Sequence, residues 1–262
     1  MNYKLIALDV DGTLLNDRHE LTPRTAELLR EIHHAGAEIV LCTGRSPTNA
    51  VPYLREMGLD GIMITHNGAA TVASREMAVL YQHSFTIEEV VPFIHFCREN
   101  NLHFDLCTPF ELYLEHVTEW EQKMYESFKM TPIVYKDLLQ FKEPIVKFTI
   151  YSEKEKVDQA EQEWGAWKTP LRMIRSHLNF IDWMHPEASK GNALQQLARV
   201  RGISREEIIA IGNYYNDMDM IEYAGLGIAM DNSPQEVKQV ADEVTASNNE
   251  DGVYLALRKY FD

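Results

Sequence analysis

Short apolar runs alternate with amphipathic stretches in the first 80 residues, a pattern that predicts strands and helices in turn. The apolar runs have the length of buried strands, and the amphipathic stretches begin at capping residues and end at glycines. Helices opened by Thr22-Pro23 and Ser46-Pro47, and closed by Gly36 and Gly58, separate strands predicted at 4–8, 38–42 and 62–65. This β-α-β-α-β order favours a parallel sheet with right-handed crossovers.

The same alternation returns after Pro186, with a helix predicted over 189–201 and strands at 208–211 and 227–230. Residues 84–184 show a different pattern of apolar and polar positions. They combine amphipathic helices at 86–100 and 153–164 with strand-like segments that include an antiparallel pair at 171–175 and 179–183. We therefore predict one α/β domain, residues 1–83 and 185–262, interrupted by an inserted α+β domain of residues 84–184.

Composition limits the classes of partner. The net charge of −15 repels nucleic acid and anionic membranes, so neither is expected to bind. The chain has no apolar run of about 18 residues or more and no leader-like N-terminus, which predicts a cytoplasmic protein. Its three cysteines are widely spaced and are expected to be reduced core residues. A phosphorylated ligand would need local help from a metal, a lysine or a helix N-terminus.

Three polar segments each follow a predicted strand: 9–13 (DVDGT), 43–45 (TGR) and 212–217 (GNYYND). Because the carboxyl ends of parallel strands share one edge of a sheet, these segments should converge. Asp9 and Asp11 are two residues apart, so their side chains should leave the strand toward the same side and attract Mg²⁺. Taken alone, Asp11-Gly12 is equally typical of a plain turn.

Together these segments resemble the signatures of the haloacid dehalogenase superfamily. Asp9-Val10-Asp11-Gly12-Thr13-Leu14 is similar to its first motif, Thr43 to the second, Lys190 to the third and the 212–217 segment to the fourth. The order and spacing of the motifs resemble the Cof-type subfamily, which has a large α/β cap. The resemblance implies a Rossmann-like catalytic core, residues 1–83 and 185–262, with residues 84–184 as the substrate-selecting cap.

The resemblance also implies roles for the motif residues. Asp9 would be the nucleophile, with a pKa near its ordinary value, and would form an aspartyl-phosphate. Asp11 would act as general acid and then as base, with a pKa raised by its acidic neighbours, and its backbone carbonyl would reach the metal. The implied phosphate-binding residues are Val10, Thr43, Gly44, Lys190 and Asn216.

Lys190 follows the predicted N-cap Ser189, at a helix end that disfavours positive charge, so we expect an anion nearby. A lone lysine there would otherwise be a solvated surface residue. Thr43, Asn216 and Asp217 likewise suit ordinary helix capping.

The implied Mg²⁺ ligand set is Asp9, Asp11, Asn213 and Asp217, with Asp217 also orienting metal waters or Lys190. Asn213 departs from the family, which usually has aspartate at this position. Arg45, His66 and Asn67 are candidate substrate contacts, although Asn67-Gly68 is also a strong hairpin signal.

The prediction is therefore a magnesium-dependent phosphatase that acts on a small phosphorylated metabolite, such as a sugar phosphate or a phosphorylated cofactor. One alternative is a phosphate-binding or regulatory protein whose turnover is weakened by Asn213. A phosphomutase is a further alternative, and a dehalogenase would need neither Asp11 nor Mg²⁺. The sequence leaves the substrate and the oligomeric state open.

Overall fold

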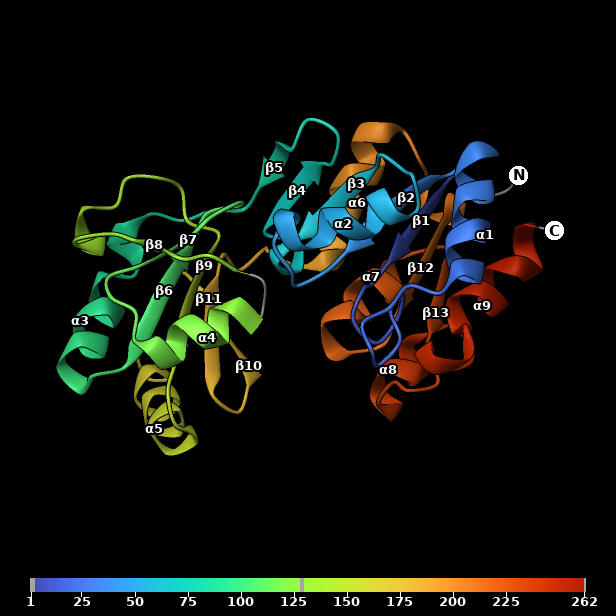
Figure 1. The fold of residues 1–262 in the computed structure, drawn as a ribbon. Coiled ribbons are helices and arrows are strands. Elements are labelled where there is room, and N and C mark those ends of the chain that lie inside the picture. Colours follow the sequence, from blue (N-terminus) through green and yellow to red (C-terminus); the bar gives the residue numbers. More distant parts are fainter. Residues whose placement is uncertain (1–2, 128–129, 262) are drawn as a thin grey trace. The chain divides into compact units, whose positions relative to one another are not determined.

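A computed structural model describes residues 3–127 and 130–261 of the chain (Figure 1). The chain forms two compact units, Met1–Tyr81 with Ser189–Asp262 and Gln82–Ala188. The predicted borders fell after residues 83 and 184 instead of 81 and 188. Residues 82–83 and 185–188, which connect the two units, belong to the second unit. The rings of His83 and His185 stack there with their centroids 5.2 Å apart.

The first unit is built on an eight-stranded sheet in the order β14-β13-β12-β1-β2-β3-β4-β5. The strands from β14 to β3 run parallel, and β4 pairs antiparallel with β3. Their bounds are β1 Leu5–Leu8, β2 Glu38–Cys42, β3 Ile62–Thr65, β4 Ala70–Ala73, β5 Ala78–Gln82, β12 Ile208–Gly212, β13 Leu226–Ala229 and β14 Glu243–Val244. This sheet and its helices confirm the predicted α/β class, whereas the β4–β5 extension was not predicted.

Helices cover this sheet because its central strands are apolar throughout. Every residue of β1 is buried, which requires cover on both faces. Leu5 and Ala7 join α6 and α7 in one apolar cluster, while Ile6 and Leu8 point to the opposite face. The helices are α1 Pro23–His34, α2 Pro47–Glu56, α6 Lys190–Arg201, α7 Met218–Tyr223, α8 Gln235–Val240 and α9 Gly252–Phe261.

The second unit has a six-stranded sheet in the order β10-β11-β9-β6-β7-β8. Its apolar face forms a core rich in aromatic side chains, including Phe93, Trp164 and Trp183. The elements are α3 Val91–Asn100, β6 His103–Cys107, β7 Leu112–Leu114, α4 Glu119–Ser127, β8 Ile133–Val134, β9 Lys147–Tyr151, α5 Lys154–Trp164, β10 Arg172–His177 and β11 Phe180–Met184. Strands β10 and β11 pair antiparallel, as the sequence pattern predicted.

Candidate active site

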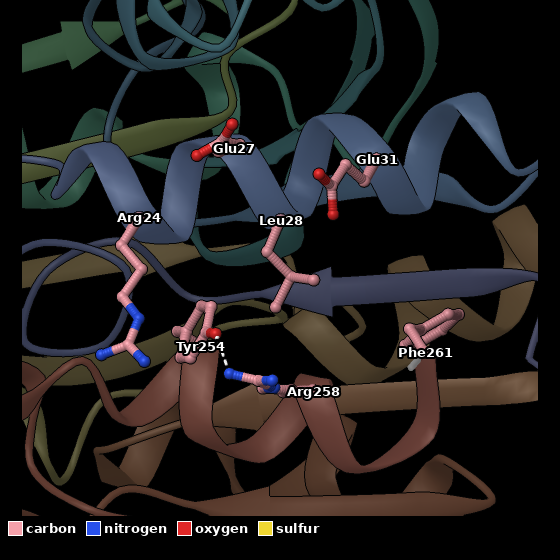
Figure 2. A pocket seen from close by; sticks show the side chains of 7 residues that line it. All are labelled: Arg24, Glu27, Leu28, Glu31, Tyr254, Arg258 and Phe261. Carbon is pink, nitrogen blue, oxygen red and sulfur yellow. Dashed lines mark hydrogen bonds between the residues drawn. The ribbon is translucent and has the colours of Figure 1, made fainter.

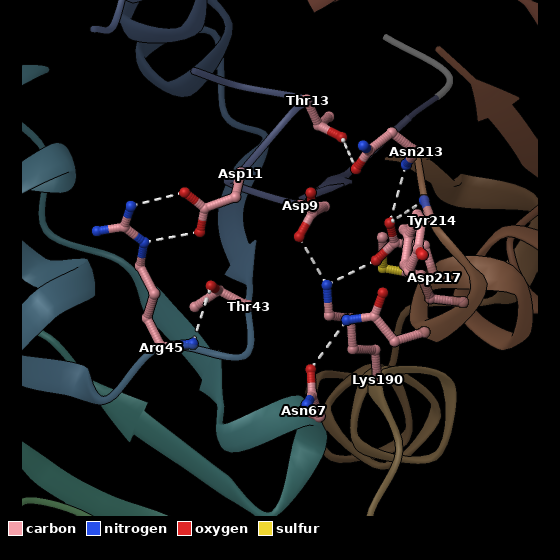
Figure 3. Close-up of polar contacts among 12 residues, drawn as sticks. Asp9, Asp11, Thr13, Thr43, Arg45, Asn67, Lys190, Asn213, Tyr214 and Asp217 are labelled. Carbon is pink, nitrogen blue, oxygen red and sulfur yellow. Dashed lines mark hydrogen bonds and ion pairs between the residues drawn. The ribbon is translucent and has the colours of Figure 1, made fainter. Parts of the chain in front are cut away.

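A buried lysine links two of the predicted segments. The Nζ atom of Lys190, the first residue of α6, lies 2.6 Å from Oδ1 of Asp9, just after β1, and 2.6 Å from Oδ1 of Asp217, just before α7 (Figure 3). The lysine side chain has no exposed surface, so it is not a solvated surface residue. The two carboxylates are the anions that its place at a helix N-terminus led us to expect.

The turn after β3 fixes the start of α6. Gly68 has a φ of 94°, and a Cβ atom there would lie 2.0 Å from the carbonyl oxygen of Ser189. Only glycine therefore allows this close approach. Asn67 and Gly68 make the turn between the antiparallel strands β3 and β4, as their hairpin signal indicated, and Asn216 Nδ2 donates to Asn67 Oδ1 at 2.9 Å. One turn thus contacts both the third and the fourth motif.

Asp217 is fully buried and holds the fourth motif together. Its Oδ1 accepts a hydrogen bond from Lys190, and its Oδ2 accepts from the backbone N–H groups of Asn213 and Tyr214 at 2.8 and 2.9 Å. These contacts engage both carboxylate oxygens. They agree with the orienting role predicted for Asp217 toward Lys190.

Burial changes the charge balance of this cluster. Burial raises the pKa of Asp9 to about 7, with a further contribution from Asp217, although Lys190 opposes the rise. Burial alone would lower the pKa of Lys190, but Asp217 and Asp9 raise it overall, so the lysine stays charged. The prediction that Asp9 keeps a near-ordinary pKa was wrong, because strand-end position alone does not reveal burial.

Asp11 points away from Asp9, toward Arg45 (Figure 3). Arg45 Nε donates to Asp11 Oδ2 at 2.7 Å, and Nη2 donates to Oδ1 at 2.6 Å. Partial burial favours the neutral carboxyl, but Arg45, with a smaller contribution from His19, lowers the pKa of Asp11 overall. Both expectations for Asp11 were therefore wrong: its side chain diverges from Asp9, and its charged partner is the Arg45 guanidinium.

The remaining predicted residues lie on the loops at the same edge of the sheet. Thr43 is buried, and its Oγ1 accepts a hydrogen bond from the backbone N–H of Arg45 at 3.1 Å. The backbone N–H groups of His66 and Asn67 donate to the carbonyl oxygens of Arg45 and Thr43, each at 3.0 Å. These bonds join the loops after β2 and β3. Val10 is buried, and its carbonyl accepts from the N–H of Leu15 at 3.0 Å.

The donor atoms around Asn213 suit a hard divalent cation. Its side-chain amide packs against the Asp11 carbonyl oxygen, Asp9 Oδ2 and Thr13 Oγ1, and with the amide oxygen toward them Thr13 Oγ1 donates to Asn213 Oδ1 at 3.1 Å. Turned the other way, the amide nitrogen would donate to all three at 3.1 Å and take the place of a cation, so only the first orientation suits a metal. One carboxylate, one carbonyl and one amide oxygen are the ligand types that Mg²⁺ accepts. Within residues 3–127 and 130–261, no three His, Cys, Asp or Glu side chains form a metal cluster. The prediction that the side chains of Asp9, Asp11 and Asp217 share one metal was therefore wrong, because Asp11 pairs with Arg45 and Asp217 with Lys190 and two backbone N–H groups. The oxygen atoms around Asn213 form a smaller set, with fewer negative charges than a site with aspartate at 213.

Replacing Asn213 with aspartate should strengthen metal binding. A full charge in place of a dipole at ligand distance should gain on the order of 1–3 kcal/mol, or roughly ten- to a hundredfold in Mg²⁺ affinity. The added charge near Asp9 should also lower the melting temperature without metal. Titrations of Mg²⁺ against activity and against melting temperature measure both effects. Equal half-saturating Mg²⁺ concentrations in the two proteins would show that residue 213 is not a ligand.

Sequence reasoning missed one neighbour of Arg45 and one of Asp11. Tyr53 on α2 accepts a hydrogen bond from Arg45 Nη1 at 3.2 Å, and Nδ1 of His19 lies 3.5 Å from Asp11 Oδ1. Tyr53 lies eight residues beyond Arg45, in the second half of α2, and no motif marked it. A pocket between α1 and α9 (Figure 2) contains none of the predicted site residues.

No helix in the described part of the chain is long and apolar enough to cross a membrane.

Comparisons with known proteins show the family of this chain. Residues 6–257 match the family of haloacid dehalogenase-like hydrolases. YxeH of Bacillus subtilis is 33% identical over 98% of both chains. YitU of the same organism, a 5-amino-6-(5-phospho-D-ribitylamino)uracil phosphatase, is 29% identical over 98% of this chain and 97% of its own.

A solved haloacid dehalogenase-like hydrolase from Bacteroides thetaiotaomicron is 32% identical, with a TM-score of 0.89 over 98% of this chain and 99% of its own. The predicted enzyme class, a phosphoric monoester hydrolase, agrees with the phosphatase name of YitU. The four motifs, their convergence and the match over nearly the whole chain place this protein in the haloacid dehalogenase-like hydrolase family.

Proposed function

We propose that the protein is a magnesium-dependent phosphatase that hydrolyses a small phosphorylated metabolite through an aspartyl-phosphate on Asp9. The observation that carries this proposal is the position of Lys190, whose ammonium contacts Asp9 and Asp217 at 2.6 Å each. A fixed cation beside a carboxylate can hold the phosphoryl oxygens while the carboxylate attacks phosphorus.

In the first step, a carboxylate oxygen of Asp9 bonds to phosphorus as the bond from phosphorus to the ester oxygen breaks. Asp11 gives a proton to the departing oxygen. In the second step, Asp11 removes a proton from water, whose oxygen attacks phosphorus and releases Asp9 and inorganic phosphate. Thr43, the Gly44 backbone N–H and Lys190 hold the phosphoryl oxygens in both steps.

Hydrolases of this family generally use a divalent metal, and we propose Mg²⁺ here. Asp9, the backbone carbonyl of Asp11 and the side chain of Asn213 would hold it. The bound ion would neutralise charge on the phosphoryl oxygens and favour the ionised form of Asp9. Lys190 supplies a second, permanent positive charge beside Oδ1 of Asp9, whereas the ion would lie on the side of Oδ2.

We also propose that the second unit selects the substrate. Asp105, Thr149 and Asp182 occupy paired positions on β6, β9 and β11, so their side chains share one face of the sheet. Each is nearly buried, and Thr149 Oγ1 donates to Asp182 Oδ1 at 2.9 Å. Nζ of Lys147 lies 3.8 Å from the same oxygen. Asp105 in turn accepts a hydrogen bond from the Tyr125 hydroxyl at 3.0 Å. A ligand that reaches this face must replace such internal partners, and one that cannot do so leaves buried polar groups unpaired.

A panel of phosphorylated sugars, cofactors and nucleotides, assayed with and without Mg²⁺, tests the proposal. Release of inorganic phosphate that requires Mg²⁺ is the expected result. Transfer of phosphate to another position of the same molecule would identify a mutase instead. Binding of panel members without release would favour the alternative of a regulatory protein weakened by Asn213.

A further inference from the structure

Asp11 cannot act as an acid in the position that it occupies here. Both of its carboxylate oxygens accept N–H groups from Arg45, at 2.6 and 2.7 Å. A proton on either oxygen would face one of these donors, and the fork geometry suits only the ionised carboxylate. The Asp11 side chain must therefore leave Arg45 before it can protonate a leaving group.

The pair between Arg45 and Asp11 is accessible, unlike the cluster around Lys190. The side chains of Arg45 and Asp11 are 25% and 44% exposed, whereas that of Lys190 is 0% exposed. Ion pairs open to solvent contribute little stability, so a competing anion can open this one. Arg45 also keeps a second anchor when the pair opens, because Nη1 donates to Tyr53 and its guanidinium lies 5.3 Å from the Tyr53 ring centroid.

We propose that Arg45 is a positioning residue with two partners: it holds the ionised Asp11 at rest in the free enzyme and pairs with the anionic end of the bound substrate. The released Asp11 then takes up a proton from solvent water and gives it to the leaving oxygen. The inference rests on the proposed function, because it assumes that Asp11 handles the proton. It adds that substrate binding itself frees the acid. An unoccupied site would then hold Asp11 ionised and turned away from Asp9.

Binding of inorganic phosphate tests the exchange of partners without any turnover. Calorimetry in the presence of Mg²⁺ would compare the wild type, Asp11→Asn, Arg45→Met and the double variant. Asp11→Asn should tighten phosphate binding about three- to tenfold when Arg45 is present, because the arginine is no longer engaged. In the Arg45→Met background most of this gain should vanish. An equal gain in both backgrounds would overturn the proposal, since Asp11 would then act only through its charge.

Steady-state kinetics provide a second readout. Arg45→Met should raise KM about tenfold or more, while kcat for an alkyl phosphate at saturation stays within about threefold, because Asp11 is no longer restrained. A fall in kcat that is larger for alkyl than for aryl phosphates would overturn the proposal. It would show that Asp11 needs Arg45 during the reaction itself.

Arg75 provides a matched control, because its Nε donates to Asp60 at 2.8 Å in another Arg–Asp pair of the first unit. Arg75→Met should leave phosphate binding and KM unchanged. If Arg45→Met does not fold, Arg45→Lys replaces it in the cycle, since lysine keeps the charge but loses the fork. If the effects of Asp11→Asn and Arg45→Met on phosphate binding are non-additive but no substrate is hydrolysed, only the proposed function is contradicted. If substrates are hydrolysed and the two effects on binding are additive, only the role of Arg45 is contradicted.

Discussion

Changing Lys190 to methionine should destabilise the protein more than any single surface change and also remove its activity. Methionine fills much of the same space but leaves Asp9 and Asp217 buried together without their shared cation. Breaking a buried ion pair in this way costs about 3–5 kcal/mol. At about 2–4 °C per kcal/mol for a chain of this size, the melting temperature should fall by roughly 6–20 °C. Phosphate release should fall at least about a hundredfold.

Lys259 is the matched control for this change. Its Nζ lies 3.0 Å from Glu243 in an exposed ion pair, so Lys259→Met should change the free energy of unfolding by less than about 1 kcal/mol. Adding Asp217→Asn to Lys190→Met should restore part of the lost stability, because one uncompensated charge disappears. Equal melting temperatures for Lys190→Met and Lys259→Met would contradict a structural role of the buried cluster.

Changing Asp9 to asparagine should lower phosphate release by at least about a thousandfold. The same change should stabilise the metal-free protein above neutral pH. The amide cannot attack phosphorus, although it has nearly the same volume. The stability effect follows from the pKa of Asp9, which burial raises from 3.8 to about 7. Between these values the unfolded chain releases a proton that the folded protein keeps, so the stability of the wild type falls as pH rises.

Asparagine has no such proton to lose. The difference in melting temperature between Asp9→Asn and wild type should therefore grow from about pH 4 to about pH 7 and then level off. Thermal unfolding in EDTA across this range, together with phosphate assays in Mg²⁺, measures both effects. A melting-temperature difference that is constant across the range would refute the raised pKa. Phosphate release above a few per cent of wild type would refute the assignment of the nucleophile.

Much of the fold could be predicted from local patterns. Thr22 caps α1 directly before Pro23, and β2 and β3 have the predicted bounds, because caps, prolines and apolar runs act over a few neighbouring residues. The β4–β5 extension escaped prediction. Strand β4 has a weak apolar pattern, and the residues of β5 are exposed or only partly buried.

The sequence by itself also determined which residues meet. Because the motifs follow parallel strands, their order alone placed Asp9, Thr43 and the fourth motif at one edge of the sheet. The helix start at Ser189 then brought Lys190 to the same edge. Convergence of this kind depends on topology, which alternating strands and helices encode.

Only the tertiary structure decided which partner each charged group takes. Burial raises the pKa of Asp9, and the turn at Gly12, whose φ is 78°, accompanies the divergence of Asp11 toward Arg45. A pKa and an ion pair depend on the distances among side chains from several elements and on the water that those elements exclude. No pattern of neighbouring residues contains these quantities, so the sequence predicted the members of the site while the fold set their charges and pairings.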